Sequence, residues 1–256
     1  MAVNVAISGF GRIGRLVLRS IIESKRKDIN VVAINDLAPV DTNAFLLAND
    51  TVHGPLNEKI SVKKNKMTIG RKTISVLNER DPQKLPWKKM KIDVALECTG
   101  LFTSKEKASM HIKAGAKKVL VSAPCSEADK TIVYGVNEQE ITRNDLVVSN
   151  ASCTTNCLAP VVKVLHEKFG IVHGYMTTIH AFTGDQSVLD TFHPDLRRAR
   201  AASMSMIPTS TGAAKAVGLV MPELSGKLDG TAIRVPTPNV SLIAVSYTHL
   251  TLPTNR

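Results

Sequence analysis

The chain has 256 residues, of which 43% are hydrophobic, and a formal net charge of +11 at pH 7. This length allows one large or two ordinary domains with a substantial core, and the composition is that of a soluble globular protein. The first ten residues contain no basic leader and no long apolar run. We therefore expect neither a secretory signal nor a membrane span, and a cytoplasmic location in which the four cysteines are thiols.

Most of the positive charge lies between residues 59 and 91, where eleven Lys and Arg residues accompany only two acids, Glu79 and Asp81. The Lys residues alternate with Ile, Val and Met at strand spacing, which favours the solvated face of a small sheet. The alternative is a weak attraction for a nucleic-acid backbone, but aromatic residues for stacking on bases are missing apart from Trp87. We expect no specific nucleic-acid partner.

Strands and helices alternate through the first 150 residues. Strands are predicted at 3–8, 29–36, 92–97 and 117–124, and helices follow the glycine loop at 9–14 and cover 43–50 and 104–116. This alternation predicts a doubly wound parallel sheet with helices on both faces.

The pattern changes near residue 150. A helix is predicted over about 154–169, a strand within 170–183 and an irregular segment over 184–208, followed by a helix within 211–224 and strands at 231–236 and 240–246. We expect two domains in direct contact, residues 1–150 and residues 151–243.

A glycine loop lies between the first predicted strand and helix, and a second strand ends in Asp36, 22 residues after the last of its glycines. This context predicts a dinucleotide site, because glycine lets the backbone approach a pyrophosphate and helix N–H groups meet its charge. Asp36 would bind the ribose and repel a 2′-phosphate, which favours NAD over NADP. The alternative is a structural turn with Asp36 as a cap. The loop residues concerned are Gly9, Gly11, Arg12, Ile13 and Gly14.

Two cysteines, Cys153 and Cys157, lie one helical turn apart in the stretch SNASCTTNC. Cys153 is expected to begin a helix, where free N–H groups and the helix dipole lower a thiol pKa, and Cys157 to face the body of the domain. We predict no metal site, because the chain has no second cysteine pair and no H-E-x-x-H motif. His180 ends the next predicted strand, so the pair Cys153–His180 is either catalytic or a buried thiol and a structural histidine.

From Val3 to Ile243 the chain resembles the phosphorylating glyceraldehyde-3-phosphate dehydrogenases, through the motifs GFGRIGR, AINDL, ERDP, SNASCTTNCLAP, TTIHAFTGDQ, DLRRARAA, STGAAKAV and RVPTPNVS. The resemblance implies a Rossmann-type NAD-binding domain followed by an α+β catalytic domain. It implies NAD-dependent oxidation of glyceraldehyde 3-phosphate to 1,3-bisphosphoglycerate, in glycolysis and gluconeogenesis, by a homotetramer. Cys153 matches the nucleophile, His180 the base that activates it and assists hydride transfer, and Cys157 a structural residue.

The same resemblance implies the remaining contacts. Arg80 and Ser122 match cofactor-binding positions. The substrate's phosphate is assigned to Thr183, Asp185 and Arg234, and the attacking inorganic phosphate to Thr154, Arg198, Thr211 and Gly212, with Ser152 beside them.

Two departures from the family matter. Residues 191–192, near a subunit contact that affects cofactor choice, differ from the common family wording, and residues 244–256 resemble no part of the family. We therefore expect an incomplete catalytic domain and a chain that is poorly soluble, does not form the tetramer and turns over negligibly. The alternatives are an erythrose-4-phosphate dehydrogenase, disfavoured by STGAAKAV, and an inactive NAD-binding or RNA-binding fragment, disfavoured by the retained catalytic residues.

Overall fold

The computed structural model describes residues 2–248, which divide into two compact units. The first contains residues 2–131 and 140–150, and the second contains residues 132–139 and 151–248. This division differs from a single boundary at residue 150, because Val133 and Val136 pack in the apolar core of the second unit. Within the tail expected at 244–256, residues 249–256 lie outside the described residues.

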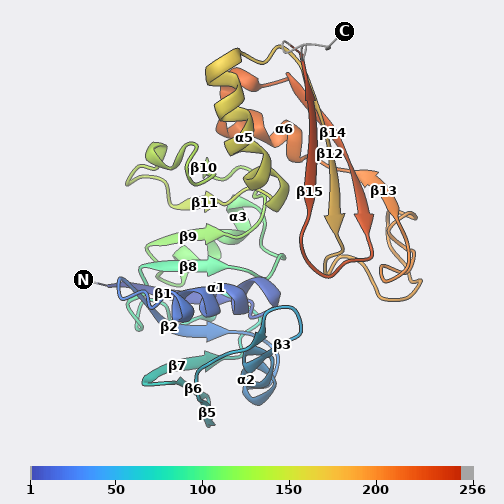
Figure 1. Ribbon diagram of the computed structural model, residues 1–256. Coiled ribbons are helices and arrows are strands. Elements are labelled where there is room, and N and C mark those ends of the chain that lie inside the picture. The colour runs from blue at the N-terminus through green and yellow to red at the C-terminus, as the bar shows by residue number, and fades with distance from the viewer. Residues whose placement is uncertain (1, 249–256) are drawn as a thin grey trace. The chain divides into compact units, whose positions relative to one another are not determined.

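The first unit is built on a sheet in which nine described strands have the order β10-β11-β9-β8-β1-β2-β7-β6-β5 (Figure 1). Neighbours from β10 to β7 are parallel, whereas β6 and β5 continue antiparallel. The predicted doubly wound parallel sheet is confirmed. Its strands are β1 (Val3–Ser8), β2 (Ile29–Asn35), β5 (Ile60–Lys63), β6 (Lys66–Ile69), β7 (Lys72–Leu77), β8 (Val94–Glu97), β9 (Lys118–Val121), β10 (Lys130–Thr131) and β11 (Val147–Ser149).

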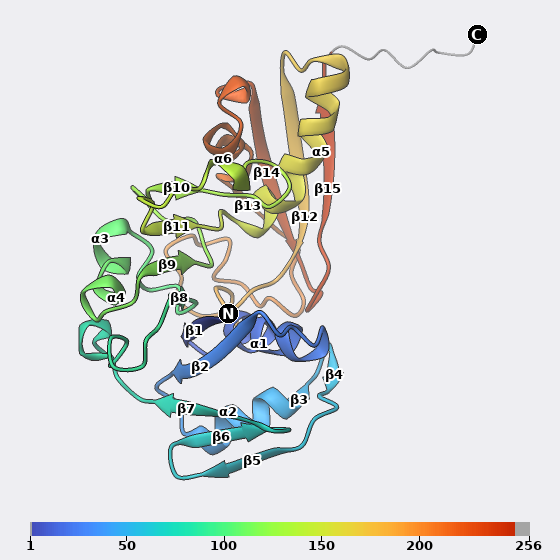
Figure 2. The ribbon, with the colours of Figure 1, turned by 90° about the vertical axis from the view of Figure 1, so that its left-hand side faces the viewer.

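Helices cover both faces of this sheet, with α1 and α4 on opposite sides in Figure 2. Successive residues of β1 face opposite layers, as strand geometry requires. Ala6 packs in one cluster with Ala108, and Ile7 packs in another with Leu18 and Leu47. The helices are α1 (Arg12–Glu23), α2 (Val40–Ala48), α3 (Lys105–Ala108) and α4 (Met110–Lys113), with 3-10 turns at Pro82–Lys84 and Glu138–Glu140 and a short hairpin of β3 (Asn49–Asp50) and β4 (Gly54–Pro55).

The single helix predicted over 104–116 is wrong in detail, because the structure has the two short helices α3 and α4 there. They are separated at Ser109, whose hydroxyl donates a hydrogen bond to the Lys105 carbonyl at 2.6 Å. A serine hydroxyl that bonds back to the preceding turn competes with the regular helical pattern.

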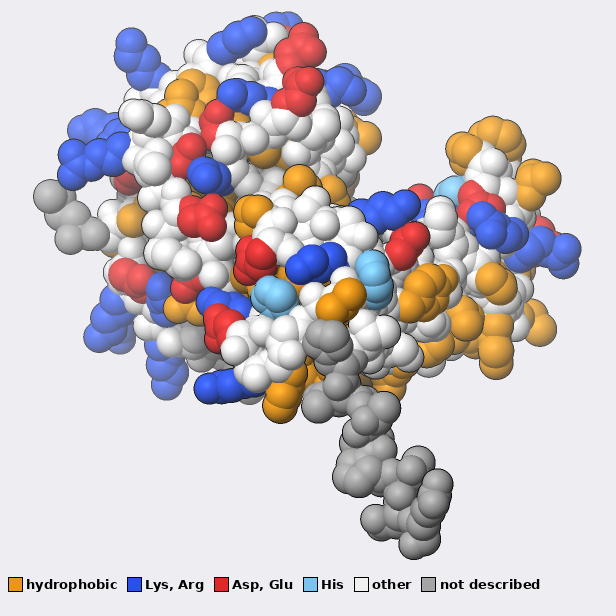
Figure 3. Space-filling model, turned by 90° about the horizontal axis from the view of Figure 1, so that it is seen from above, with side chains coloured by type: hydrophobic (Ala, Val, Ile, Leu, Met, Phe, Trp, Pro, Cys, Tyr) orange, Lys and Arg blue, Asp and Glu red, His pale blue; other side chains and the backbone are white. Residues whose placement is uncertain are grey.

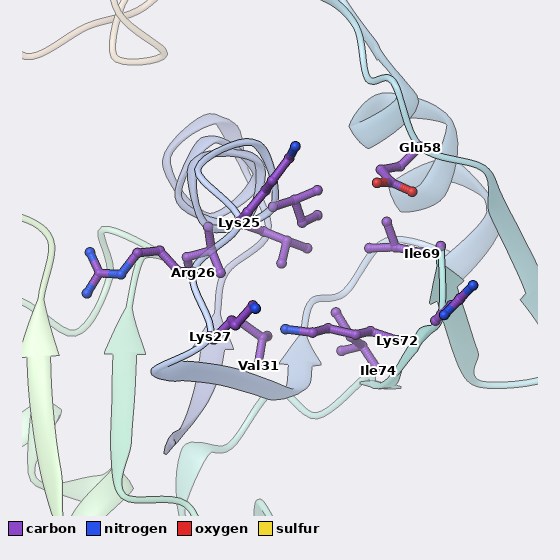
Figure 4. A pocket seen from close by; sticks show the side chains of 13 residues that line it. Lys25, Arg26, Lys27, Val31, Glu58, Ile69, Lys72 and Ile74 are labelled. Carbon is purple, nitrogen blue, oxygen red and sulfur yellow. The ribbon is translucent and has the colours of Figure 1, made fainter. Parts of the chain in front are cut away.

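The basic stretch forms the antiparallel meander β5–β7, and its predicted alternation is confirmed. Met67 and Ile74 are buried, whereas Lys63, Lys66 and Lys72 are exposed. Between this meander and the end of α1 lies a pocket of about 490 Å³ with an aliphatic lining and a cationic rim. Figure 4 shows the Lys27 and Lys72 side chains turned toward one another at this pocket. The excess charge of the chain is therefore a surface property of one end of the first unit.

The second unit has a mixed sheet of order β13-β14-β12-β15. The central strands β12 and β14 are parallel, and each pairs antiparallel with its outer neighbour. The two helices of this unit are joined by a hydrogen bond, since the Thr155 hydroxyl of one donates to the Ala213 carbonyl of the other at 3.1 Å. The elements are α5 (Cys153–Phe169), β12 (Gly174–Ala181), β13 (Ile207–Ser210), α6 (Ala213–Val220), a 3-10 turn at Pro222–Leu224, β14 (Leu228–Val235) and β15 (Leu242–Tyr247).

None of the helices within residues 2–248 is long and apolar enough to cross a membrane.

The packing of α1 on the glycine loop yields a stability prediction. A Cβ at Gly14 would lie 2.2 Å from the Gly9 carbonyl oxygen, whereas a Cβ at Gly11 would have no neighbour within 4 Å. Gly14→Ala should therefore lower the free energy of unfolding by about 1–3 kcal/mol, as overpacking does, and the matched control Gly11→Ala should cost less than about 1 kcal/mol. Denaturant titration measures both, and equal losses would contradict this explanation.

Candidate active site

Cys153 is the first residue of α5. The turn before it places Ala151 at a φ of +54°, and the extended Ser152 caps the helix by accepting a hydrogen bond from Thr155 N at 3.0 Å. The exposed Cys153 side chain therefore lies at the positive end of a helix dipole of seventeen residues. A thiolate is favoured at such a position.

His180 faces Cys153 from the end of β12, with its Nε2 atom 3.2 Å from the Cys153 sulfur. Its Nδ1 lies 2.7 Å from the Ala181 carbonyl oxygen, which only accepts, so Nδ1 carries a proton. Arg234 Nη1 lies 3.1 Å from Nδ1 and 3.3 Å from the Ala181 oxygen. Because a guanidinium group only donates, its hydrogen bond goes to the carbonyl and not to the protonated Nδ1.

The contact between Cys153 and His180 shifts the pKa values of the two groups in opposite directions. The hydrogen bond from His180 lowers the pKa of the Cys153 thiol, against the opposing effect of desolvation. The hydrogen bond to Cys153 raises the pKa of His180, although desolvation and the Arg234 charge act the other way. By contrast, burial raises the pKa of Cys98 to about 11 and also raises the pKa of Cys125. Both shifts favour the thiolate form of Cys153 and the imidazolium form of His180.

Two arginines give this part of the second unit a positive potential. Burial lowers the pKa of Arg234, and the charge of Arg198 lowers it further, while Cys153 and Asp185 raise it, so these four groups lie within electrostatic reach. The Nε atom of Arg234 is buried without a hydrogen-bond partner among the described residues. An unsatisfied guanidinium donor near a second arginine suits a phosphate or carboxylate oxygen.

Arg198 is already oriented by protein groups. It donates from Nη1 to Asp185 at 2.9 Å and from Nε to the Thr209 hydroxyl at 3.0 Å. Burial opposes the shift at Asp185, but hydrogen bonds from His193 and Arg198 outweigh it and lower the pKa of that carboxyl. Asp185 therefore acts as an acceptor that holds Arg198, while the start of α6 at Gly212 has no side-chain cap.

The glycine loop of the first unit has the geometry of a dinucleotide site. Gly9 adopts a φ of +86°, and α1 begins without a side-chain cap because its N-cap is Gly11. The space beside Gly11 is open, so a pyrophosphate can approach the free N–H groups of the first helical turn. At the end of β2 the Asp36 carboxylate accepts from Phe10 N at 2.7 Å and Ala38 N at 2.8 Å. The residues present fit an NAD molecule.

Comparison with known proteins decides the family. Residues 3–105 match the family model described as "Glyceraldehyde 3-phosphate dehydrogenase, NAD binding domain". Residues 152–253 match the family model described as "Glyceraldehyde 3-phosphate dehydrogenase, C-terminal domain". The chain is 65% identical over 247 residues to the glyceraldehyde-3-phosphate dehydrogenase of Xanthobacter flavus, covering 96% of this chain and 74% of that protein. It belongs to this family. The enzymes of Cereibacter sphaeroides and Geobacillus stearothermophilus are 64% and 57% identical, covering 96% and 95% of this chain and 74% and 72% of their own.

The dehydrogenase family confirms NAD as the cofactor, glyceraldehyde 3-phosphate as the substrate and the α/β fold of the first unit. The match to the C-terminal domain extends through residue 253, ten residues past Ile243, where we expected the likeness to end. Residues 244–247 belong to β15, which pairs with β12 through Ala244 and Tyr247 among others.

Among the residues we predicted for the dehydrogenase site, the second unit brings together Cys153, His180, Arg198, Arg234 and Asp185. The first unit holds the glycine loop, Asp36, an exposed Arg80 and a half-buried Ser122. Ser152 and Thr211 serve locally as helix-start acceptors, since the Thr211 hydroxyl accepts from Ala213 N at 3.2 Å. Thr154 is buried at the start of α5, and Thr183 is exposed after β12. Within residues 2–248 no group of three His, Cys, Asp or Glu side chains is placed to hold a metal ion.

Cys157 does not face the body of the domain as we expected, because its side chain is exposed. Residues four apart in a helix lie on nearly the same face. Because Cys153 is exposed, Cys157 is exposed on the same face of α5, and the buried face is formed by residues such as Leu158 and Val162.

The groups that orient Arg198 were not predicted from the sequence. The Thr209 hydroxyl accepts from Arg198 and donates to Asp195 at 2.8 Å, and Asp195 also accepts from Arg197 at 3.0 Å. Hydrogen bonds from Arg197 and then Thr209 hold the pKa of Asp195 well below its usual range. The motif DLRR is the available signal, since it sets a carboxylate beside two arginines, but the role of Thr209 depends on the pairing of β13 with β14.

The shifted pKa values predict selective alkylation of the dehydrogenase. With limiting iodoacetamide, Cys153 should react first, and its rate should reach half its maximum at a pH below the ordinary thiol range near 8.5. His180→Asn should move that midpoint upward, whereas Cys157→Ser should leave it unchanged. Peptide mapping after labelling checks the order, and earlier labelling of the exposed Cys157 would refute the assignment.

Proposed function

We propose that Cys153 is the nucleophile and His180 the acid–base group of an NAD-dependent, phosphorylating oxidation of glyceraldehyde 3-phosphate. The observation that carries this proposal is the 3.2 Å contact between the Cys153 sulfur and His180 Nε2 at the start of α5. It joins a polarised thiol to a histidine whose Nδ1 proton is held by the Ala181 carbonyl. Sulfur and base are within the reach that nucleophilic catalysis requires.

The thiolate of Cys153 attacks the aldehyde carbon, forming a C–S bond, and the carbonyl oxygen takes the His180 proton to complete a thiohemiacetal. His180 then removes that hydroxyl proton as the hydride leaves the same carbon, which produces a thioester. NAD, when bound, accepts the hydride. An oxygen of inorganic phosphate attacks the thioester carbon and expels the Cys153 thiolate, which gives 1,3-bisphosphoglycerate and restores the site.

Two phosphate subsites follow from the arginines. We assign the substrate's phosphate to Arg234, Thr183 and Asp185, and Asp185 also orients the guanidinium group of Arg198 beside it. The attacking phosphate is assigned to Arg198, with the start of α5 and the start of α6 as further donors, supplied by Ser152, Thr154, Thr211 and Gly212. The Nε of Arg234, which has no hydrogen-bond partner among the described residues, supports the first of these assignments.

The cofactor is assigned to the first unit and the chemistry to the second. Gly9, Gly11, Arg12, Ile13 and Gly14 would bind the pyrophosphate. Asp36 would bind the ribose, with Arg80 and Ser122 as further contacts to the cofactor. The open space beside Gly11 supports this placement.

The full-length form of the protein is proposed to act in the cytoplasm as a homotetramer. Between residues 188 and 206, six large apolar side chains are at least 70% exposed, namely Val188, Leu189, Phe192, Leu196, Met204 and Met206. Hydrophobic side chains gather at the right-hand side of Figure 3, the side on which β13 and the segment before it lie in Figure 1. An apolar surface of this kind is typical of a subunit contact.

The central test replaces the nucleophile. In a full-length version, Cys153→Ser should reduce phosphate-dependent NADH production from glyceraldehyde 3-phosphate by a factor of at least about 1,000, because a hydroxyl is not ionised at this site. The matched control Cys157→Ser should retain activity, and both variants should bind NAD as the unaltered chain does. Faster turnover of erythrose 4-phosphate, indifferent to added phosphate, would contradict the proposed substrate.

A second test separates the phosphate subsites. Arg198→Gln should raise the KM for inorganic phosphate by roughly tenfold or more, because it removes a charge-assisted hydrogen bond of about 1.5–3 kcal/mol. The neighbouring exposed Arg197→Gln is the control and should leave that KM nearly unchanged. Steady-state kinetics at varied phosphate measure both, and an equal effect of the two substitutions would show that Arg198 has no direct contact.

A further inference from the structure

A buried polar chain in the first unit takes no part in the chemistry described above. Trp87, His111 and Glu97 are 0%, 0% and 1% exposed. The Trp87 indole nitrogen lies 3.0 Å from His111 Nδ1, and His111 Nε2 lies 2.9 Å from Glu97 Oε2. Buried polar groups of this kind are retained only when every donor and acceptor is satisfied.

The chemistry of the three side chains fixes which atom donates in each of these two hydrogen bonds. An indole N–H only donates, so His111 Nδ1 must be an unprotonated acceptor. The His111 proton is therefore on Nε2 and is donated to Glu97, which leaves the imidazole neutral. The buried Glu97 carboxylate therefore accepts hydrogen bonds from neutral donors, and neither Trp87 nor His111 gives it a cationic partner.

The other carboxylate oxygen of Glu97 fixes the turn that follows β8. Its Oε1 accepts from Thr99 N at 2.7 Å and also from the Thr99 hydroxyl. The turn continues into Gly100 at a φ of +73°. One buried carboxylate therefore sets both the backbone and the side chain of Thr99.

This turn is in direct contact with the glycine loop. A Cβ at Gly9 would lie 2.6 Å from Thr99 N and 2.7 Å from the Cys98 carbonyl carbon, so only a glycine fits between the two segments. The strands that precede them, β1 and β8, are neighbours in the parallel sheet. The chain connects β1 through α1 to β2 on the other side, so the topological switch point, where such sheets bind ligands, lies between β1 and β8.

We propose that Glu97, oriented by His111 and Trp87, is a positioning residue for the dinucleotide, because it fixes the Thr99 turn as one wall of the NAD crevice. The opposite side of the loop is held by Asp36 through Phe10 N. The glycine loop therefore lies between two carboxylates. Asp36 is on the side of the proposed ligand, and Glu97 is buried behind the Thr99 turn. This inference rests on the proposed placement of NAD at the glycine loop.

The test is the isosteric substitution Glu97→Gln. The side-chain amide that this substitution introduces has two possible orientations. If its oxygen accepts from Thr99, its NH₂ group faces the Nε2 proton of His111, so that two donors meet. If it is reversed, the NH₂ group faces Thr99 N, and again two donors meet. His111 cannot relieve the conflict by changing tautomer, since Trp87 requires Nδ1 as an acceptor. The turn must therefore lose a hydrogen bond or leave a buried donor unpaired.

Isothermal titration with NAD should give a Kd raised about tenfold by Glu97→Gln, and exchange of the Thr99 amide hydrogen should become faster in the protein without ligand. The pH profile of Cys153 alkylation should not change. Met67→Ala, a fully buried position on β6 away from the crevice, is the control for lost stability. It should lower the Tm at least as much as Glu97→Gln does without changing the Kd.

A Kd for Glu97→Gln that equals that of the unaltered chain or of Met67→Ala would overturn the positioning role and leave the NAD site standing. Absence of NAD binding by the unaltered chain would overturn the cofactor placement itself, and this role with it. Should Glu97→Gln fail to fold, Thr99→Val removes only the hydroxyl and should raise the Kd about fivefold. An unchanged Kd for that variant would equally refute the proposal.

Discussion

The chemistry of the second unit depends on one contact, that between the Cys153 sulfur and His180 Nε2. Neither side chain is brought there by local sequence alone. His180 lies on β12, which is paired along eight residues with β14 and along six with β15, and His180 itself pairs with Arg234 of β14. Cys153 is positioned by α5, whose first turn is tied to α6 through Thr155 and Ala213. A sheet and two helices therefore hold a sulfur–nitrogen distance, and the helix dipole adds to the polarisation of the thiol.

The parts of this architecture that follow local rules were predictable. The glycine loop, the strand that ends in Asp36 and the helix that begins at Cys153 each have a sequence signature with a physical cause. The break at Ser109 was missed because the surrounding residues follow a helical pattern, and the bond from the serine hydroxyl to the preceding turn is visible only in the structure. The exposure of Cys157 was mispredicted although the helical period was known, because the buried face of α5 is chosen by its tertiary packing.

The electrostatic partners of the arginines could not be predicted from the sequence. Asp185 and Thr209 both contact Arg198, yet they come from different elements that only the folded sheet brings together. A sequence shows the number of charges but not their pairing. The proposed anion site contains carboxylates as well as cations, because an acceptor on the protein side keeps a guanidinium group in one orientation.

The two hydrogen bonds at Asp36 have a consequence for changing the cofactor preference of this enzyme. The Asp36 carboxylate, which we propose binds the ribose, also accepts from Phe10 N and Ala38 N, so it is part of the loop beside which it lies. Removing it to admit a 2′-phosphate would also release two backbone donors, and the glycine loop would lose its anchor on that side. A successful redesign for NADP would have to keep an acceptor for those two amides and place the new cation elsewhere. In this fold, selectivity and loop shape are therefore inherited together.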